Sequence, residues 1–253
     1  MFTLADFEIY QQRFQSDPEW NGRRLEIRRR LQALGDDLKQ RFSEQGIALD
    51  RRESLHNPHA SNGKKVRRQR TMLFRDKKAK KALQSFLGKE LGRDLDSAVN
   101  NAHFQLGLDV DGAYWGLRID QGAWYDLNVL IKRAEEGEGR AELVAAAQAA
   151  PGYILRLDGK GDRPLEGMSD RDWRDLAGTV RPGETSLEVI QRMPAGSVLD
   201  AGAHMGRWAC YYATAARSRK VWALEPVATN VEHMRSYYVP SLPNLRPMHG
   251  ALG

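Results

Sequence analysis

The feature that most constrains the fold is a pair of short apolar segments near the end of the chain, separated by the length of one helix. The first is Val198-Leu199-Asp200 and the second is Val221-Trp222-Ala223-Leu224-Glu225-Pro226. Apolar runs bounded by glycine and proline predict buried strands. The expected order is strand 197–201, helix 206–217, strand 220–225, helix 229–238 and a last strand within 245–252. Strands that alternate with helices pair in parallel, so we expect a partial α/β, Rossmann-like half-domain over 181–253.

The residues before 181 follow a different pattern, which predicts an α+β domain with an antiparallel sheet over 1–180. Phe104, Leu106 and Leu108 alternate with other residues before the turn at Asp111-Gly112, and alternation resumes after that turn. This spacing predicts a β-hairpin over 103–119. One more short strand is expected over 153–157.

Helices are expected at several places in the N-terminal domain. Apolar residues at three- and four-residue steps predict an amphipathic helix over 23–45 that ends at Gly46; its stripe consists of Ile27, Leu31, Leu34, Leu38 and Phe42. Further helices are predicted over 126–136, over 141–150, after a capping box at Ser169–Asp172, and over 186–192.

Composition excludes several protein classes. The hydrophobic fraction of 41% is enough for a packed core, and the single Cys210 excludes an internal disulfide framework. No apolar run approaches the roughly 20 residues that span a bilayer, and the first residues lack the features of a signal peptide. We therefore expect a cytoplasmic protein without a membrane span.

The net charge of +6 is distributed unevenly along the chain. Residues 20–93 contain 21 Lys or Arg and 8 Asp or Glu, and the segment 64–81 holds ten basic residues against one Asp. Such a segment neutralises phosphates in nucleic-acid-binding proteins, or it forms a solvated face or a loop that covers an acidic neighbour. The first interpretation predicts a polyanion site at Lys64, Lys65, Arg67, Arg68, Arg70, Lys77 and Lys78.

Histidines give no sign of a metal site. His56 and His59 are three residues apart and His103 begins the predicted hairpin, but this spacing matches no strong zinc pattern. We predict no metal. His103 is expected to be a strand residue that makes a hydrogen bond.

The two apolar strands carry a candidate cofactor site at their carboxyl ends, where open α/β sheets bind ligands. Gly202 and Gly206 allow a close approach of the backbone, Asp200 ends the first strand, and Glu225 ends the second, where a carboxylate binds ribose hydroxyls. A dinucleotide fingerprint requires glycine two and five positions after Gly202, but His204 and Arg207 stand there. This departure disfavours NAD and favours S-adenosylmethionine, which carries no phosphate.

These residues bear a likeness to a known family. The segments Val198–Gly206 and Val221–Pro226, continuing to Asn230, resemble the FkbM-type class I methyltransferases. The resemblance covers about residues 183–253 and departs from the family at His204, where the family usually has Asn. It implies an S-adenosylmethionine site that involves Asp200, Gly202, Ala203, His204, Gly206 and Glu225. It also implies O-methyl transfer to a hydroxyl acceptor on a small molecule, a glycan or a lipid.

The resemblance lacks the later strands of that family, which carry adenine contacts and the catalytic and substrate groups. Three parallel strands with an open edge expose backbone donors and apolar surface. We therefore expect either a fragment of a longer methyltransferase, a truncated chain, or a partner chain that completes the sheet. The alternative function is a non-enzymatic nucleic-acid or polyanion-binding module that uses the basic segment 64–81.

Overall fold

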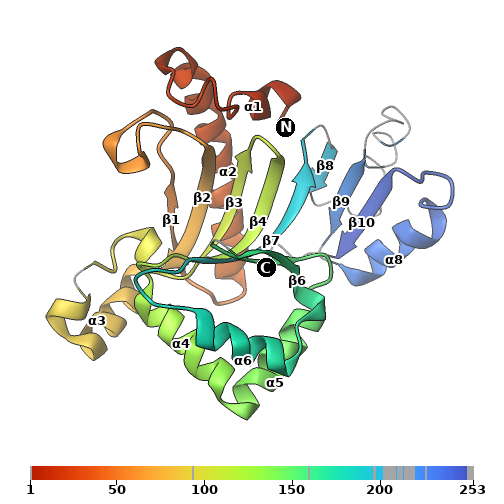
Figure 1. Cartoon of the computed structure of the whole chain (residues 1–253). Helices are drawn as coiled ribbons and strands as arrows, with labels where there is room; N and C mark the ends of the chain where they lie inside the picture. Colours follow the sequence, from red (N-terminus) through yellow and green to blue (C-terminus); the bar gives the residue numbers. More distant parts are fainter. Residues whose placement is uncertain are drawn as a thin grey trace.

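The chain contains two β-sheets of different kinds. The computed structural model describes residues 2–92, 94–158, 160–195, 198–201, 209, 213, 220–225 and 227–249. A seven-stranded sheet has the order β1-β2-β3-β4-β7-β5-β6, and a three-stranded sheet has the order β10-β9-β8. Figure 1 shows the three-stranded sheet to one side of the larger one, with α8 beside it.

All strand pairs of the larger sheet are antiparallel. Its strands are β1 (Leu49–Glu53), β2 (Arg68–Arg75), β3 (His103–Asp109), β4 (Gly112–Ile119), β5 (Ile154–Leu157), β6 (Gly161–Pro164) and β7 (Leu187–Pro194). The predicted hairpin is confirmed as β3 and β4, with Asp109 opposite Gly112. The N-terminal part is therefore an α+β fold built on an antiparallel sheet.

Two groups of helices cover the apolar face of this sheet. These are α2 (Asn21–Glu44), and the layer formed by α4 (Trp124–Glu135), α5 (Gly137–Gln148) and α6 (Asp170–Thr179). Leu38 and Phe42 of α2 pack on Leu73, whereas α4–α6 pack on Leu155, Leu157 and Leu187. The register puts all of these strand residues on the same face, and Figure 1 shows α2 behind the central strands and α4–α6 as a layer below.

Shorter elements complete the N-terminal part. They are α1 (Leu4–Glu8), α3 (Lys77–Gly92) and the 3-10 turns η1 (Pro18–Trp20), η2 (Ala60–Asn62), η3 (Ala98–Asn100) and η4 (Leu165–Gly167). In Figure 1, α3 extends from the lower end of β2. The capping box at Ser169 is confirmed, since its hydroxyl accepts a hydrogen bond from the Asp172 N–H and the Asp172 carboxylate accepts one from the Ser169 N–H.

The three-stranded sheet is parallel, as the alternation of strands and helices predicts. It contains β8 (Val198–Ala201), β9 (Val221–Glu225) and β10 (Leu245–His249), and α8 (Ala228–Tyr237) connects the last two. Val221, Ala223 and Leu245 are buried against Val231 and Met234 of α8. The predicted helix over 206–217, with Cys210, lies outside the described residues apart from 209 and 213.

The structure corrects three expectations. Residues 186–192 do not form a helix: they belong to β7, which pairs with β4 and β5, so the larger sheet continues beyond the expected boundary at residue 180. The basic segment 64–81 contains a central strand, β2, and the start of α3. Leu34 of the predicted apolar stripe is 37% exposed, and the neighbouring Gly35 is buried instead, where a Cβ would collide with Thr71.

No helix within the described part of the chain is long and apolar enough to cross a membrane.

Candidate functional site

The carboxyl ends of β8 and β9 lie at the same edge of the parallel sheet. Asp200 is opposite Ala223 and Ala201 is opposite Leu224, so Glu225 follows directly at the end of β9. The backbone of Asp200 is described but its side chain is not. Gly202, Ala203, His204 and Gly206 lie outside the described residues. Of the predicted cofactor residues, the structure therefore describes the side chain of Glu225 alone.

Glu225 is a buried carboxylate held at the start of α8. It is 4% exposed, and its Oε1 accepts hydrogen bonds from the Val227 N–H at 3.0 Å and from Asn230 Nδ2 at 3.1 Å. Asn230 lies in the first turn of α8, where a helix favours negative charge. These contacts orient the carboxylate at the carboxyl edge of β9. Asn230 belongs to the sequence pattern that carried the resemblance, and its contact with Glu225 gives this residue a physical role.

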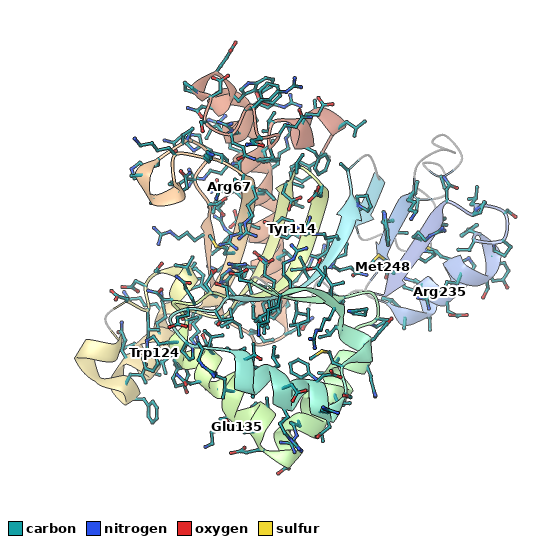
Figure 2. All side chains as sticks on the ribbon, in the orientation of Figure 1. Arg67, Tyr114, Trp124, Glu135, Arg235 and Met248 are labelled. Carbon is teal, nitrogen blue, oxygen red and sulfur yellow. The ribbon has the colours of Figure 1, made fainter. Side chains whose placement is uncertain are left out.

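The structure divides the predicted polyanion site. Lys64, Lys65 and Arg67 are exposed at one end of β2, whereas Lys77 and Lys78 are exposed at the start of α3, beyond the other end. An eight-residue strand is roughly 25 Å long, so the two groups are well separated. Figure 2 shows Arg67 far from Trp124, which lies on the α3 side of the molecule.

Arg68 and Arg70, the remaining two residues of that prediction, lie in a buried ionic cluster. Arg68 Nη1 donates to Glu188 Oε1 at 3.0 Å, and Arg70 Nη1 donates to Gln105 Oε1 at 2.7 Å. Charge in this segment therefore contributes to the interior of the sheet as well as to its surface.

This cluster covers the second face of the seven-stranded sheet, which we call the polar face. The register places on it Arg68 and Arg70 of β2, His103, Gln105 and Asp109 of β3, Tyr114 and Arg118 of β4, Glu188 and Arg192 of β7, and Arg156 of β5. β3 and β4 lie between β2 and β7, a separation of three strand spacings or about 14 Å. In the register Arg68 is level with Pro194, six residues or about 20 Å along β7 from Glu188. Because Arg68 nevertheless contacts Glu188, the sheet is strongly twisted and curved toward the polar face.

Glu188 is the centre of the polar face. It is 2% exposed, and its Oε1 accepts hydrogen bonds from Arg118, from Arg68 and, at 3.2 Å, from Gln105. Burial by itself raises the pKa of Glu188, but Arg118 and Arg68 outweigh burial and lower this pKa to about 2. Glu188 is therefore ionised at neutral pH and fixes two arginines.

His103 begins β3 and makes the hydrogen bond that the sequence predicts, between its Nδ1 and the Asn101 carbonyl oxygen at 3.0 Å. Its Nε2 lies 3.9 Å from Asp120 Oδ2, and both atoms are buried without a hydrogen-bond partner among the described residues. Burial, and next the charge of Arg70, lower the pKa of His103 to about 4. The imidazole is therefore neutral at neutral pH. No group of three or more metal-ligating side chains occurs in the part of the chain that the structure describes.

The sequence contains a pattern that marks the polar face, but the same pattern also fits a strand face exposed to solvent. Polar residues recur at every second position in β2 and β3, as Arg68-x-Arg70 and His103-x-Gln105. Period-2 polarity normally indicates a strand face in contact with solvent. Here the concave curvature lets long side chains from non-adjacent strands meet and bury one another.

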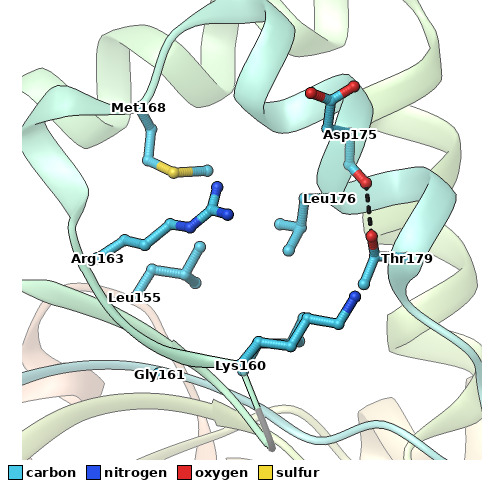
Figure 3. Close-up of a pocket in the computed structure, with 9 residues that line it drawn as sticks. Leu155, Lys160, Gly161, Arg163, Met168, Asp175, Leu176 and Thr179 are labelled. Carbon is cyan, nitrogen blue, oxygen red and sulfur yellow. Dashed lines mark hydrogen bonds between the residues drawn. The ribbon is translucent and has the colours of Figure 1, made fainter.

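Two cavities lined by described residues lie on the opposite side of the sheet, which the helices cover. One of about 80 Å³, shown in Figure 3, is lined by Leu155, Met168 and Leu176, with Lys160 and Arg163 beside them. The other, of about 230 Å³, has an almost entirely apolar lining that includes Phe42, Phe104, Trp115 and Tyr153. Both are smaller than the pockets of about 300–1,000 Å³ that hold drug-sized ligands. The lining of the smaller cavity also includes Asp175 and Thr179.

Comparison with known proteins adds no family assignment: no protein-family model matches the chain, and no curated protein matches it.

Proposed function

We propose that the chain binds S-adenosylmethionine at the carboxyl edge of β8 and β9 and takes part in methyl transfer to a hydroxyl acceptor. One observation carries the proposal. A buried carboxylate, Glu225, ends the middle strand of a parallel β10-β9-β8 sheet, directly beside the end of β8. Ligands of open α/β sheets bind outside the carboxyl ends of the strands.

The chemistry of Glu225 suits the ribose of this cofactor. An ionised carboxylate accepts hydrogen bonds from two vicinal hydroxyls, and the contacts from Val227 and Asn230 hold this one in a single orientation. When bound, the cofactor supplies a methyl group on a sulfonium for an in-line displacement by the acceptor oxygen. The contribution of the chain is to hold and align the reactants, a task for which orientation alone lowers the barrier substantially.

Calorimetric titration of the full chain with S-adenosylmethionine and S-adenosylhomocysteine tests the binding step. Loss of hydrogen bonds to a charged group costs about 1.5–3 kcal/mol, so Glu225→Ala is expected to weaken binding about 10- to 100-fold. Glu232→Ala is the matched control, because Glu232 is an exposed glutamate on the adjacent α8. Equal affinities for the wild type and Glu225→Ala, or no binding by the wild type, contradict the proposal.

Incubation with methyl-labelled cofactor tests the chemical step. Glycan, lipid and small-molecule hydroxyl fractions are offered as acceptors to the wild type and to Glu225→Ala. We expect label transfer that depends on Glu225. Cofactor binding without transfer to any fraction restricts the proposal to binding.

A second candidate function, polyanion binding, has narrower support. Lys64, Lys65 and Arg67 are exposed and make no ion pair within the described residues. A gel-shift titration at two salt concentrations tests it with the triple substitution of these residues to alanine. Each lost phosphate contact reduces the salt slope by about 0.9 for a DNA duplex. No shift at low salt dismisses this function.

A further inference from the structure

The polar face contains more positive than negative charge. Apart from Arg52 and Asp50 of β1, whose opposite charges cancel, five arginines (Arg68, Arg70, Arg118, Arg156 and Arg192) face four carboxylates (Asp109, Asp120, Asp162 and Glu188) among the described residues. Two of these pairs are bidentate, although Arg156 Nη1 also lies 3.9 Å from Glu188 Oε2. Arg156 binds both oxygens of Asp162 at 2.7 Å, and Arg192 binds both oxygens of Asp109 at 2.8 and 3.0 Å. The surplus of one positive charge therefore belongs to the central group of Arg68, Arg70 and Arg118 with Glu188 and Asp120.

Arg70 is the least compensated cation of that group. Arg68 and Arg118 each hydrogen-bond a carboxylate, whereas the Arg70 guanidinium donates to the neutral amide of Gln105. The carboxylate oxygen Asp120 Oδ2 lies 3.8 Å from Arg70 Nη2, beyond hydrogen-bond distance. Burial, and next the charge of Arg68, lower the pKa of Arg70 to about 10. Within the described residues, the protein thus holds a buried guanidinium without a hydrogen-bonded anion.

Tyr114 places an unused donor in the same row of the polar face as Arg70, close enough to act on its charge. Arg70, Gly107 and Tyr114 form one row across β2, β3 and β4. A Cβ at Gly107 would lie 2.6 Å from both Cζ and the hydroxyl oxygen of Tyr114, so the phenol lies over Gly107 and extends toward β2. The hydroxyl is buried and has no hydrogen-bond partner among the described residues. A buried hydroxyl without a hydrogen-bond partner lowers the stability of the folded state, so its presence here suggests a role other than stability.

We propose that the polar face binds the carboxylate of a small organic acid, which Arg70 receives through its guanidinium and to which Tyr114 donates its hydroxyl hydrogen. Arg and carboxylate pair in a fork geometry, and a phenol adds one charge-assisted hydrogen bond. A monoanion balances the surplus charge, whereas a phosphate dianion overcompensates it. The Arg68 side chain is about one-third exposed, and its charge acts on both Arg70 and Tyr114. The site does not depend on the cofactor edge of β8 and β9.

Titration of the full chain with sodium acetate and sodium benzoate tests this site, with sodium chloride at equal ionic strength as the reference. The readout is the NMR signal of the arginine Nε–H groups in protein labelled with ¹⁵N-arginine. We expect saturable shifts with the carboxylates and none with chloride. Arg70→Lys keeps the charge but loses the fork, and Tyr114→Phe loses one hydrogen bond to a charged group; each is expected to weaken binding about tenfold.

The matched control is Tyr153→Phe. The Tyr153 hydroxyl accepts a hydrogen bond from Trp115 Nε1 on the helix-covered face, away from the proposed site. This variant and Glu225→Ala are expected to bind the carboxylates as the wild type does. A ligand role for Tyr114 also predicts that Tyr114→Phe without ligand unfolds at an unchanged or higher temperature. The proposal is overturned if neither carboxylate gives saturable shifts, if Tyr114→Phe binds as the wild type does, or if inorganic phosphate binds more tightly than both carboxylates.

Discussion

The two faces of the seven-stranded sheet share the same strands but are stabilised by different interactions. On the helix-covered face, Leu155, Leu157 and Leu187 pack against α4–α6, where burial of apolar surface is the main favourable term. On the polar face, burial is itself unfavourable, and ion pairs around Glu188 offset it. Leu187 and Glu188 are neighbours in β7 and are both 2% exposed. Burial of Leu187 therefore stabilises the fold, whereas burial of the equally buried Glu188 is by itself destabilising.

The largest effect is expected for Glu188→Ala. The substitution leaves Arg118 and Arg68 buried without their carboxylate, and such a loss costs about 3–5 kcal/mol of unfolding free energy. Urea unfolding of the purified variant measures this. Glu184→Ala, at an exposed turn glutamate, is the control and should change the unfolding free energy by less than about 0.5 kcal/mol. If Glu188→Ala also changes the unfolding free energy by less than about 0.5 kcal/mol, the stability of the polar face does not depend on its central carboxylate.

Leu187→Ala tests the other face at the adjacent position. Truncation of a buried leucine removes transfer free energy and leaves a cavity, so we expect a loss of about 2–5 kcal/mol. The two faces should differ in how the cost of a substitution depends on ionic strength. The loss of unfolding free energy in Leu187→Ala should be the same at low and high ionic strength, since no charge is involved. A strong salt dependence of that cost argues against a purely apolar role for Leu187.

The pH dependence of stability separates the faces further. The pKa of Glu188 is about 2 in the folded protein, against an ordinary value of 4.5. A lowered carboxyl pKa contributes stability that is fully present above the ordinary value and is lost as pH falls toward the folded value. Lowering the pH from 7 to 3 should therefore remove about 2 kcal/mol through Glu188.

Glu188→Gln removes the titrating group and should flatten this part of the profile, whereas Leu187→Ala should keep the slope of the wild type. Unfolding free energies at a series of pH values provide the comparison. Identical slopes in the wild type and Glu188→Gln exclude Glu188 as the source.

The smallest effect is expected at the cap of α6, which lies in the helical layer. Ser169→Ala removes the hydroxyl that accepts from the Asp172 N–H, and loss of an N-cap residue costs about 1 kcal/mol. Thermal unfolding should show a small decrease in the midpoint. Ser169→Asp, which keeps a capping oxygen, should restore the wild-type midpoint, and failure to do so argues against the capping role.

Local patterns predicted those helices and strands whose intrinsic conformational preference agrees with their surroundings in the fold. The hairpin around Asp111-Gly112, the helices around Leu31 and Leu127, the three parallel strands after residue 197 and the helix between the last two are confirmed. The sequence also pointed to Glu225 at a strand end, and the structure adds its contacts with Val227 and Asn230. Its role in binding a cofactor stays a prediction.

The sequence did not predict β1, β2, β6 and β7, and for β7 and β2 the physical reason is clear. β7 contains Leu187, Ile190 and Met193 at helix-like steps, and only its pairing with β4 and β5 decides that it is extended. β2 contains Arg68, Arg70 and Arg75, which predicted a solvated segment. Its arginines are held by carboxylates and an amide from β3, β7 and α4, which lie up to 120 residues away along the chain.

The sequence by itself determined the β3–β4 hairpin, several helices and the parallel pairing of the strands after residue 197, because turn residues and apolar periodicity act within a few residues of one another. Only the tertiary structure decided that the polar face is buried, that Glu188 lies at its centre, and that Tyr114 lies over Gly107 in the row of Arg70. Curvature of the sheet produces these contacts by bringing non-adjacent strands within reach of one another, and curvature is a property of the whole sheet rather than of any single segment.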